Sequence, residues 1–143
     1  MDKQTSALAL TIFAAAESIK AQDIIGVDLS TVESYTDFVT IASGGSDRQV
    51  VSIADNVIKS GFKKHHMHPL GVEGYEAAEW VLIDFGEVIV HVFQQSVRDH
   101  YHLEDMWMQV KPISQDEFIK TVKASVVKKV VRSRISAKTK RKK

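Results

Sequence analysis

The sequence predicts an α/β domain in which helices flank a mixed β-sheet. Three observations support this fold class: an amphipathic segment opens the chain, a strand leads directly into a well-capped helix, and a tight turn joins two β-rich runs. Strands joined by a tight turn are antiparallel, whereas a strand followed by a helix suits a crossover to a parallel neighbour. One sheet with both kinds of neighbour satisfies all three observations.

The first half of the chain is predicted to form an opening helix, two strands and a second helix. The opening segment is rich in Ala with apolar residues at helical spacing, and turn residues bound the β-rich runs. Ser46 and Gln49 have the spacing of a capping box, and Gly61 supplies a stop signal for the helix that follows. The predicted ranges are 6–22 for the first helix, 24–29 and 38–42 for the strands, and 46–61 for the second helix.

The second half begins with a loop-rich stretch that has room for one short strand, and a hairpin follows. Gly86 marks its turn. Ser114 and Glu117 form a second capping box ahead of apolar residues at helical spacing, although β-branched residues weaken that helix. The predicted ranges are 62–79 for the loop, 80–83 and 88–93 for the hairpin strands, 96–100 and 103–108 for short helical pieces, and 136–143 for a disordered end.

Composition narrows the class of protein. The 143 residues are 44% apolar and 26% charged and include no Cys, which excludes disulfides, Cys-ligated zinc and cysteine nucleophiles. No apolar run approaches the roughly 18 residues of a membrane helix. Thr11 interrupts the N-terminal apolar segment, and no small-residue cleavage site follows it. We therefore expect a cytoplasmic protein.

Charge is divided unevenly along the chain. Residues 1–117 carry 8 Lys and Arg against 18 Asp and Glu, whereas residues 118–143 carry 11 Lys and Arg and no acid. An acidic body with a basic tail indicates that the tail meets a polyanion or the chain's own body. The predicted organisation is a domain of residues 1–113 followed by a basic C-terminal extension of residues 114–143, helical or disordered.

A Gly44-Gly45-Ser46 turn lies between a predicted strand and a helix start, where backbone N–H groups and the helix dipole can hold a phosphate. This resembles the opening motif of the nucleotidyltransferase superfamily, whose chemistry also needs paired carboxylates for Mg²⁺. The nearest acids, Asp84 and Glu87, lie about forty residues downstream and three apart across a turn. We expect that the glycines only allow a tight turn, and a nucleotide-binding or nucleotidyl-transferring enzyme stays the alternative.

Two further groups of residues stand out. Three histidines, His65, His66 and His68, have metal-ligand chemistry, but without Cys nearby we expect them to face water and to hold no metal. Residues 80–107 combine aromatic and charged residues of the types enriched at the centres of protein interfaces. Strand alternation leaves core packing open as the alternative for these aromatic residues.

Several motifs in and before this stretch carry a family resemblance. They are Asp37-Phe38-Val39, Gly44-x-Ser46-x-Arg48, Glu73-Gly74, Trp80-Val81-Leu82-Ile83-Asp84, His91-Val92-Phe93, Arg98, Tyr101 and Leu103-Glu104-x-x-Trp107. In this order, over about residues 8–110, the chain resembles the ribosomal silencing factor family, also called Iojap-related. The resemblance implies a nucleotidyltransferase-like fold with no transferase role, hence no enzyme and no cofactor.

The resemblance also implies a partner. Members bind the large ribosomal subunit through ribosomal protein L14 on its intersubunit face, block joining of the small subunit and so repress translation. Carried over by position, the implied partner-binding residues are Trp80, Asp84, His91, Phe93, Arg98, Tyr101, Leu103, Glu104 and Trp107.

The basic tail lies beyond the resemblance. We expect its cations to contact ribosomal RNA through phosphates, with Lys128, Lys129, Arg132 and Arg134 as candidates. A solvated extension is the alternative, and a homodimer of the free protein is left open.

Overall fold

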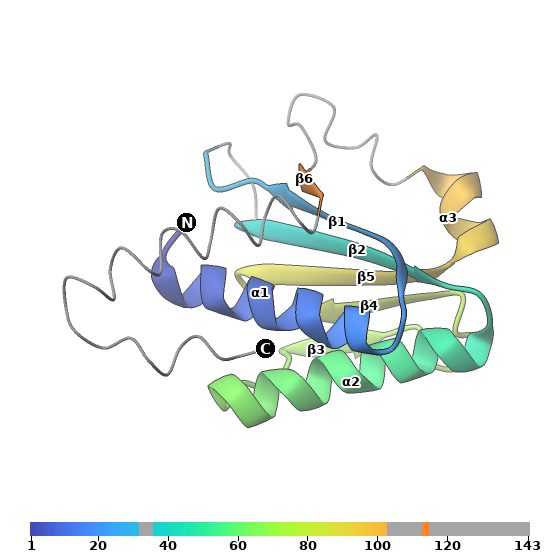
Figure 1. The fold of residues 1–143 in the computed structure, drawn as a ribbon, viewed down its shortest axis with the longest axis horizontal. Coiled ribbons are helices and arrows are strands. Elements are labelled where there is room, and N and C mark those ends of the chain that lie inside the picture. The colour runs from blue at the N-terminus through green and yellow to red at the C-terminus, as the bar shows by residue number, and fades with distance from the viewer. Residues whose placement is uncertain (32–35, 103–112, 115–143) are drawn as a thin grey trace.

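A mixed sheet with two long helices on one face forms the body of the protein (Figure 1). The computed structural model describes residues 1–31, 36–102 and 113–114. Its elements are α1 (Lys3–Ser18), β1 (Gln22–Asp28), β2 (Phe38–Gly44), α2 (Asp47–His65), β3 (Gly71–Glu73), β4 (Trp80–Asp84), β5 (Val88–Gln94), α3 (Gln95–Tyr101) and β6 (Ile113–Ser114). The six strands lie in the order β3-β4-β5-β2-β1-β6, and the predicted fold class is confirmed.

The pairing within the sheet is mixed, as predicted. β2 and β5 are parallel, and the four other neighbouring pairs are antiparallel. β4 and β5 form the predicted hairpin, and the crossover from β2 through α2 leads to β5, which lies beside β2 in the sheet. The loop-rich stretch contains the one short strand for which it has room, β3.

The opening helix begins and ends earlier than predicted. Asp2 is its N-cap, because a side-chain oxygen of Asp2 accepts a hydrogen bond of 2.7 Å from the backbone N–H of Thr5. At the other end α1 stops at Ser18, and Lys20 has a φ of 62°, which no helix can contain. The helix therefore occupies residues 3–18 rather than 6–22.

The capping box that opens α2 is confirmed, whereas the predicted stop is wrong. Ser46 Oγ accepts from the backbone N–H of Gln49 at 3.1 Å. The helix continues through Gly61 to His65, and His66 in the left-handed conformation ends it. Gly61 is a packing residue, since a Cβ there would lie 3.2 Å from the Phe85 ring in the hairpin turn. A glycine near the C-terminal end of this helix lets the helix approach the turn closely.

The two faces of the sheet have different neighbours. α1 and α2 cover one face, and their apolar residues form a single core with those of the strands (Figure 1). Alternate strand residues point to the opposite face, which we call the outer face. A second apolar cluster lies there, and α3, at the end of the sheet, adds Val97 to it. Its buried members are Val27, Leu29, Val39, Ile41 and Phe93.

The C-terminal predictions are tested in part. The short helix predicted at 96–100 is present as α3, while the one at 103–108, the helix after Ser114 and the disordered end lie outside the described residues. Ser114 lies in β6, where it pairs with Ile25, so β6 spans the predicted boundary between residues 113 and 114. Among the helices described, none is both long and apolar enough to cross a bilayer.

Candidate partner-binding surface

The strand register brings several of the predicted partner-binding residues together on the outer face. Across β4 and β5, Trp80 pairs with Phe93, Leu82 with His91, and Asp84 with Ile89. Because side chains directly opposite one another in a sheet share a face, these three pairs form neighbouring rows. The register of β3 adds Glu73 beside Leu82 at the edge of the sheet.

Trp80 is the centre of this arrangement. Its indole Nε1–H donates a hydrogen bond of 2.9 Å to Nδ1 of His91, and its ring lies over Phe93 with centroids 4.9 Å apart. The rings of His91 and Phe93 stack with centroids 6.1 Å apart. Trp80 itself is half-buried, so one part of the indole packs on the sheet and another part reaches the surface.

His91 is held neutral by its surroundings. Only 5% of its surface is exposed, and burial lowers its pKa to about 4, because an imidazolium would lose its hydration there. Since Nδ1 accepts the hydrogen bond from Trp80, the ring proton of the neutral imidazole sits on Nε2. His91 therefore acts within this chain as a fixed hydrogen-bond acceptor.

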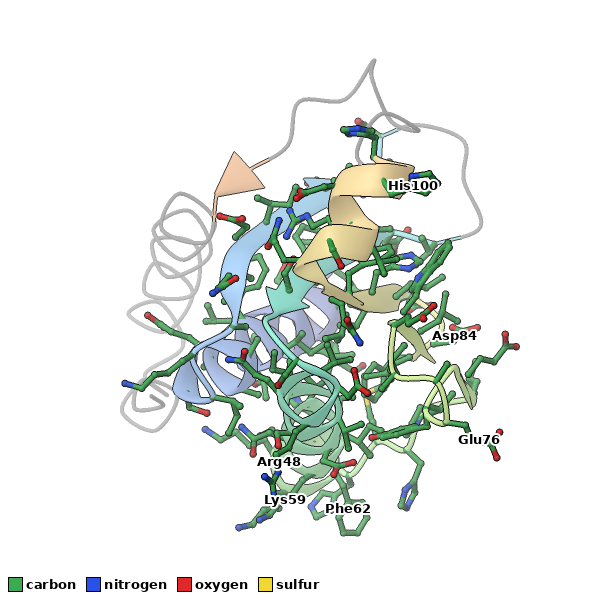
Figure 2. All side chains as sticks on the ribbon, turned by 90° about the vertical axis from the view of Figure 1, so that its right-hand side faces the viewer. Arg48, Lys59, Phe62, Glu76, Asp84 and His100 are labelled. Carbon is green, nitrogen blue, oxygen red and sulfur yellow. The ribbon has the colours of Figure 1, made fainter. Side chains whose placement is uncertain are left out.

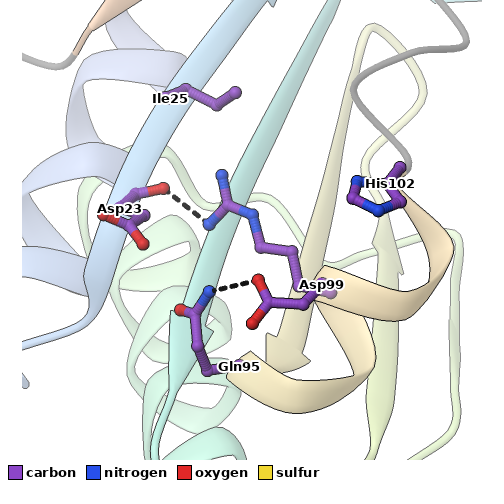
Figure 3. Close-up of a pocket in the computed structure, with 6 residues that line it drawn as sticks. Asp23, Ile25, Gln95, Asp99 and His102 are labelled. Atoms are coloured by element: carbon purple, nitrogen blue, oxygen red, sulfur yellow. Dashed lines mark hydrogen bonds between the residues drawn. The ribbon is translucent and has the colours of Figure 1, made fainter.

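Phe93 and Arg98 are buried as well. Phe93 is fully buried under Trp80, and Arg98 is 5% exposed. The guanidinium of Arg98 donates to the main-chain oxygen of Asp23 at 2.7 Å (Figure 3). It also donates to Ser43 Oγ at 2.8 Å, and the two bonds tie α3 to the ends of β1 and β2. These two side chains thus position the surface from beneath.

Asp84 supports the hairpin turn. Its carboxylate accepts a 2.7 Å hydrogen bond from the backbone N–H of Gly86, whose φ of 93° is favourable only for glycine. Tyr101 ends α3, and the other predicted residues lie outside the described part of the chain: Leu103, Glu104, Trp107, Lys128, Lys129, Arg132 and Arg134.

Leu82 is the surface residue that the sequence analysis did not single out. It is half-buried on the outer face between Glu73 and His91, and it belongs to neither apolar cluster. The signal for it was strand alternation, which places Leu82 on the same face as Trp80 and Asp84. An apolar side chain between an exposed acid and a fixed aromatic group is suited to contact a partner.

Backbone N–H groups of the turn between β2 and α2 donate to side chains of the same turn. The backbone N–H of Gly45 donates to Oε1 of Gln49 at 2.7 Å, and Asp47 in the first turn of α2 accepts from the side-chain amide of Gln94. A Cβ on Gly44 would lie 3.2 Å from the backbone nitrogen of Val50, so this glycine permits a close approach of strand to helix. The side chains of Gln49 and Ser46 therefore accept from two backbone N–H groups of this turn, which a phosphate would need.

The remaining candidates carry no metal-binding geometry. His65 is hydrogen-bonded to Thr11 Oγ1 at 2.8 Å, and His66 and His68 lie against the ring of Phe62. Within the described ranges, no group of three or more His, Cys, Asp or Glu is placed to hold a metal ion.

An open hollow of about 320 Å³ beside α3 is lined by Asp23, Ile25, Gln95, Arg98, Asp99 and His102 (Figure 3).

Comparison with known proteins decides the family. The family described as "Ribosomal silencing factor during starvation" matches residues 2–143. This chain is a ribosomal silencing factor family member. The "Ribosomal silencing factor RsfS" of Chromobacterium violaceum is 42% identical over 98 residues, which are 68% of this chain and 80% of that protein.

A solved structure and a more distant relative agree with this family. A crystal structure of a Chromobacterium violaceum protein superimposes with a TM-score of 0.68 at 38% identity and covers 75% of this chain and 87% of that one. The mouse protein named "Mitochondrial assembly of ribosomal large subunit protein 1" is 29% identical over 89 residues, 61% of this chain and 39% of its own length. The predicted family is confirmed.

Proposed function

We propose that this protein binds the large ribosomal subunit through ribosomal protein L14, sterically blocks joining of the small subunit and so represses translation in the cytoplasm. Family membership is the observation that carries the proposal, since the matched family is defined by ribosomal silencing during starvation. The mouse relative is named for assembly of the large subunit, which supports that subunit as the partner. The mechanism is occupation of space and involves no chemical step.

The outer face is the proposed docking surface. Leu82 and Trp80 offer apolar and aromatic area of the kind that forms the centre of interfaces. An exposed acid borders them, because Glu73 lies beside Leu82 in the register of β3 and β4. The described residues carry 13 Asp and Glu against 7 Lys and Arg. An acidic surface suits a basic ribosomal protein and would speed its association.

The buried residues of this region have a positioning role in the proposal. His91 fixes the indole of Trp80 by a hydrogen bond, and Phe93 supports it from beneath. A rigid aromatic group loses little conformational freedom when a partner binds, so it contributes more to affinity than a mobile one. By the family resemblance, Tyr101, Leu103, Glu104 and Trp107 are proposed as further partner contacts.

The decisive experiment measures binding to purified ribosomal subunits. The full chain should co-sediment with large subunits, not with small ones, and should inhibit subunit joining. Leu82→Ala should weaken binding by about 1 to 2 kcal/mol while the domain stays folded. Leu10→Ala is the matched control, because Leu10 is a half-buried leucine on α1 that packs against the core. Equal sedimentation with both subunits, or with neither, contradicts the proposal.

Charge reversal tests the proposed acidic border. Glu73→Lys should slow association with isolated L14, and the effect should shrink as salt is raised. Glu17→Lys, at an exposed position of α1, is the control. If both reversals change the association rate equally, only the net charge of the body matters and the outer face is not the docking surface.

The proposed contact of the tail with ribosomal RNA is tested by salt dependence. The full chain should lose affinity for large subunits with rising salt more steeply than residues 1–113. Four to six phosphate contacts would make the two slopes differ by about three to five. Equal slopes and equal affinities would identify the tail as a solvated extension.

Sedimentation of the protein without ribosomal subunits reports whether the free protein is a homodimer.

Absence of catalysis is tested with labelled nucleotides and Mg²⁺. The proposal expects no turnover, because the side chains of Gln49 and Ser46 already accept from backbone N–H groups of the turn. Metal-dependent turnover that disappears in Asp84→Asn would establish the enzyme alternative instead.

A further inference from the structure

The outward side of α2 near its C-terminal end carries an exposed group of cationic and aromatic residues. Lys59, Phe62 and Lys63 recur at spacings of three and four, so they share one face of the helix, and all three are exposed. Figure 2 shows Lys59 and Phe62 pointing away from the body. Together with His68, which stacks on Phe62, we call them the α2 patch.

The charge of this region is opposite to that of the body. Residues 56–72 contain three Lys, three His and no Asp or Glu, whereas the described residues as a whole have an excess of acids. Lysines in the last turn of a helix are favoured by the helix dipole, which accounts for Lys63. Lys59 lies more than one turn before the end at His65, so the dipole does not account for it. Lys59 and Lys63 thus add positive charge to this end of α2.

The aromatic part of the patch is ordered although it is exposed. Phe62 is 46% exposed, its ring stacks on His68 with centroids 4.7 Å apart and planes at 28°, and His66 meets it edge-on at 6.0 Å. A bulky apolar side chain this exposed is uncommon in the described residues, where only Met1 and Leu70 are similar. The stack presents flat π surface on the same side of α2 as two exposed lysines.

We propose that the α2 patch is an RNA-binding surface. In this arrangement Lys59 and Lys63 contact phosphates, while the stacked rings of Phe62 and His68 receive an unpaired base. Aromatic platforms flanked by cations bind single-stranded nucleic acid in this way, because every base has a π face and every linkage a charge. The inference rests on the proposed function only for the source of the RNA, and it concerns a different surface from the outer face.

The charged half of the proposal is tested with the full chain and two RNA probes of about 12 nucleotides, one single-stranded and one a duplex, by fluorescence anisotropy at several salt concentrations. Lys59→Gln with Lys63→Gln should weaken binding to both probes. For the single strand, the salt slope should fall by about 1.4, since each contact contributes about 0.7. The matched control is Lys3→Gln with Lys20→Gln, two exposed lysines at the ends of α1. An equal loss in the control pair would overturn the proposal.

The aromatic half is tested by Phe62→Ala. This variant should bind the single-stranded probe at least about fivefold more weakly and the duplex as before, because only an unpaired base can stack. Thermal melting confirms that each variant is folded. Unchanged binding of the single strand would overturn the base contact.

Isolated L14 separates this proposal from the previous one. The α2 variants should bind L14 as the parent chain does, and a specific loss there would make the patch a protein-binding surface and overturn the RNA assignment. If the parent chain itself fails to bind L14 while the RNA results hold, the proposed function fails and the α2 patch stands.

Discussion

Trp80 and His91 are joined across strands β4 and β5 by a hydrogen bond of 2.9 Å from the indole Nε1–H to Nδ1 of the imidazole. Trp80 lies directly opposite Phe93, so this bond runs diagonally to the next residue on the same face. The bond determines which imidazole nitrogen carries the proton, and it holds the indole in one orientation. Both properties depend on the imidazole remaining neutral.

The low pKa of His91 makes stability depend on pH. The folded protein keeps His91 neutral down to a pKa of about 4, whereas the unfolded chain takes up the proton near 6.5. Between these values the unfolded state binds more protons, so the free energy of unfolding falls as the pH is lowered. We expect a loss of about 3 kcal/mol from this residue between pH 7.5 and pH 4. Chemical denaturation at several pH values measures it.

The control for this prediction is His91→Gln, which keeps an acceptor for Trp80 and has no proton to gain. Acid-induced losses from carboxylates are common to both proteins and cancel in the difference. If parent and variant lose stability in parallel, His91 is not the group responsible.

Two strand glycines should respond differently to the same change. A Cβ on Gly26 would lie 2.3 Å from the ring of Phe38 and 2.9 Å from that of Phe13, so Gly26→Ala forces two buried rings apart. We expect a loss of about 3 kcal/mol or more. At Gly71 nothing lies within 4 Å of the added atom, and Gly71→Ala should be within about 0.5 kcal/mol of the parent. Equilibrium unfolding of both variants gives the comparison.

Gln49 connects two elements by its side chain. Its amide group accepts from Gly45 N and donates to the main-chain oxygens of Ile19 and Lys20, which closes the C-terminal end of α1. Gln49→Ala should lower the free energy of unfolding by about 2 kcal/mol. Gln49→Glu keeps the acceptor but places a negative charge at the carbonyl end of α1, so it should restore little of the lost free energy of unfolding. Full stability in the glutamate variant would show that the donated bonds contribute nothing.

Arg98 should be needed for stability more than for direct contact with a partner. Arg98→Met removes the charged donor from Asp23 O and Ser43 Oγ, and we expect a loss of about 2 to 4 kcal/mol. Ser96→Ala, at an exposed position of the same helix, should change stability by less than about 0.5 kcal/mol. Calorimetry compares the two. An Arg98→Met variant with an unchanged melting temperature and weakened ribosome binding would identify a contact residue instead.

Local signals in the sequence predicted the local structure well. The box of Ser46 and Gln49 and the hairpin turn at Gly86 depend on residues close together in the chain, and both were predicted correctly. The prediction that Gly61 ends the helix was wrong, because this glycine is needed for a contact distant in the sequence, the one with the ring of Phe85. The sequence alone does not distinguish a glycine that ends a helix from one that lets a helix pack closely against its neighbour.

The candidate surface could be predicted only in part. Strand alternation placed Trp80, Leu82 and Asp84 on one face, but the register that sets His91 and Phe93 beside them is a property of the folded sheet. Burial also depends on what packs from outside, which is why Arg98 is enclosed although arginine is usually exposed. The aromatic stack of Phe62 on His68 has the same origin, because the left-handed turn at His66 brings the two rings together.

The strands at the borders of the described sheet are its shortest. β3 has three residues and β6 has two, while β1, β2 and β5 have seven each and lie inside. A border strand as short as β3 offers few free main-chain N–H and C=O groups, so another chain can add only a short strand to that border. Accidental self-association through the backbone is thereby suppressed. Recognition of a ribosome would then depend on side chains on one face of the sheet. This restricts the fold to partners whose surface chemistry matches that face.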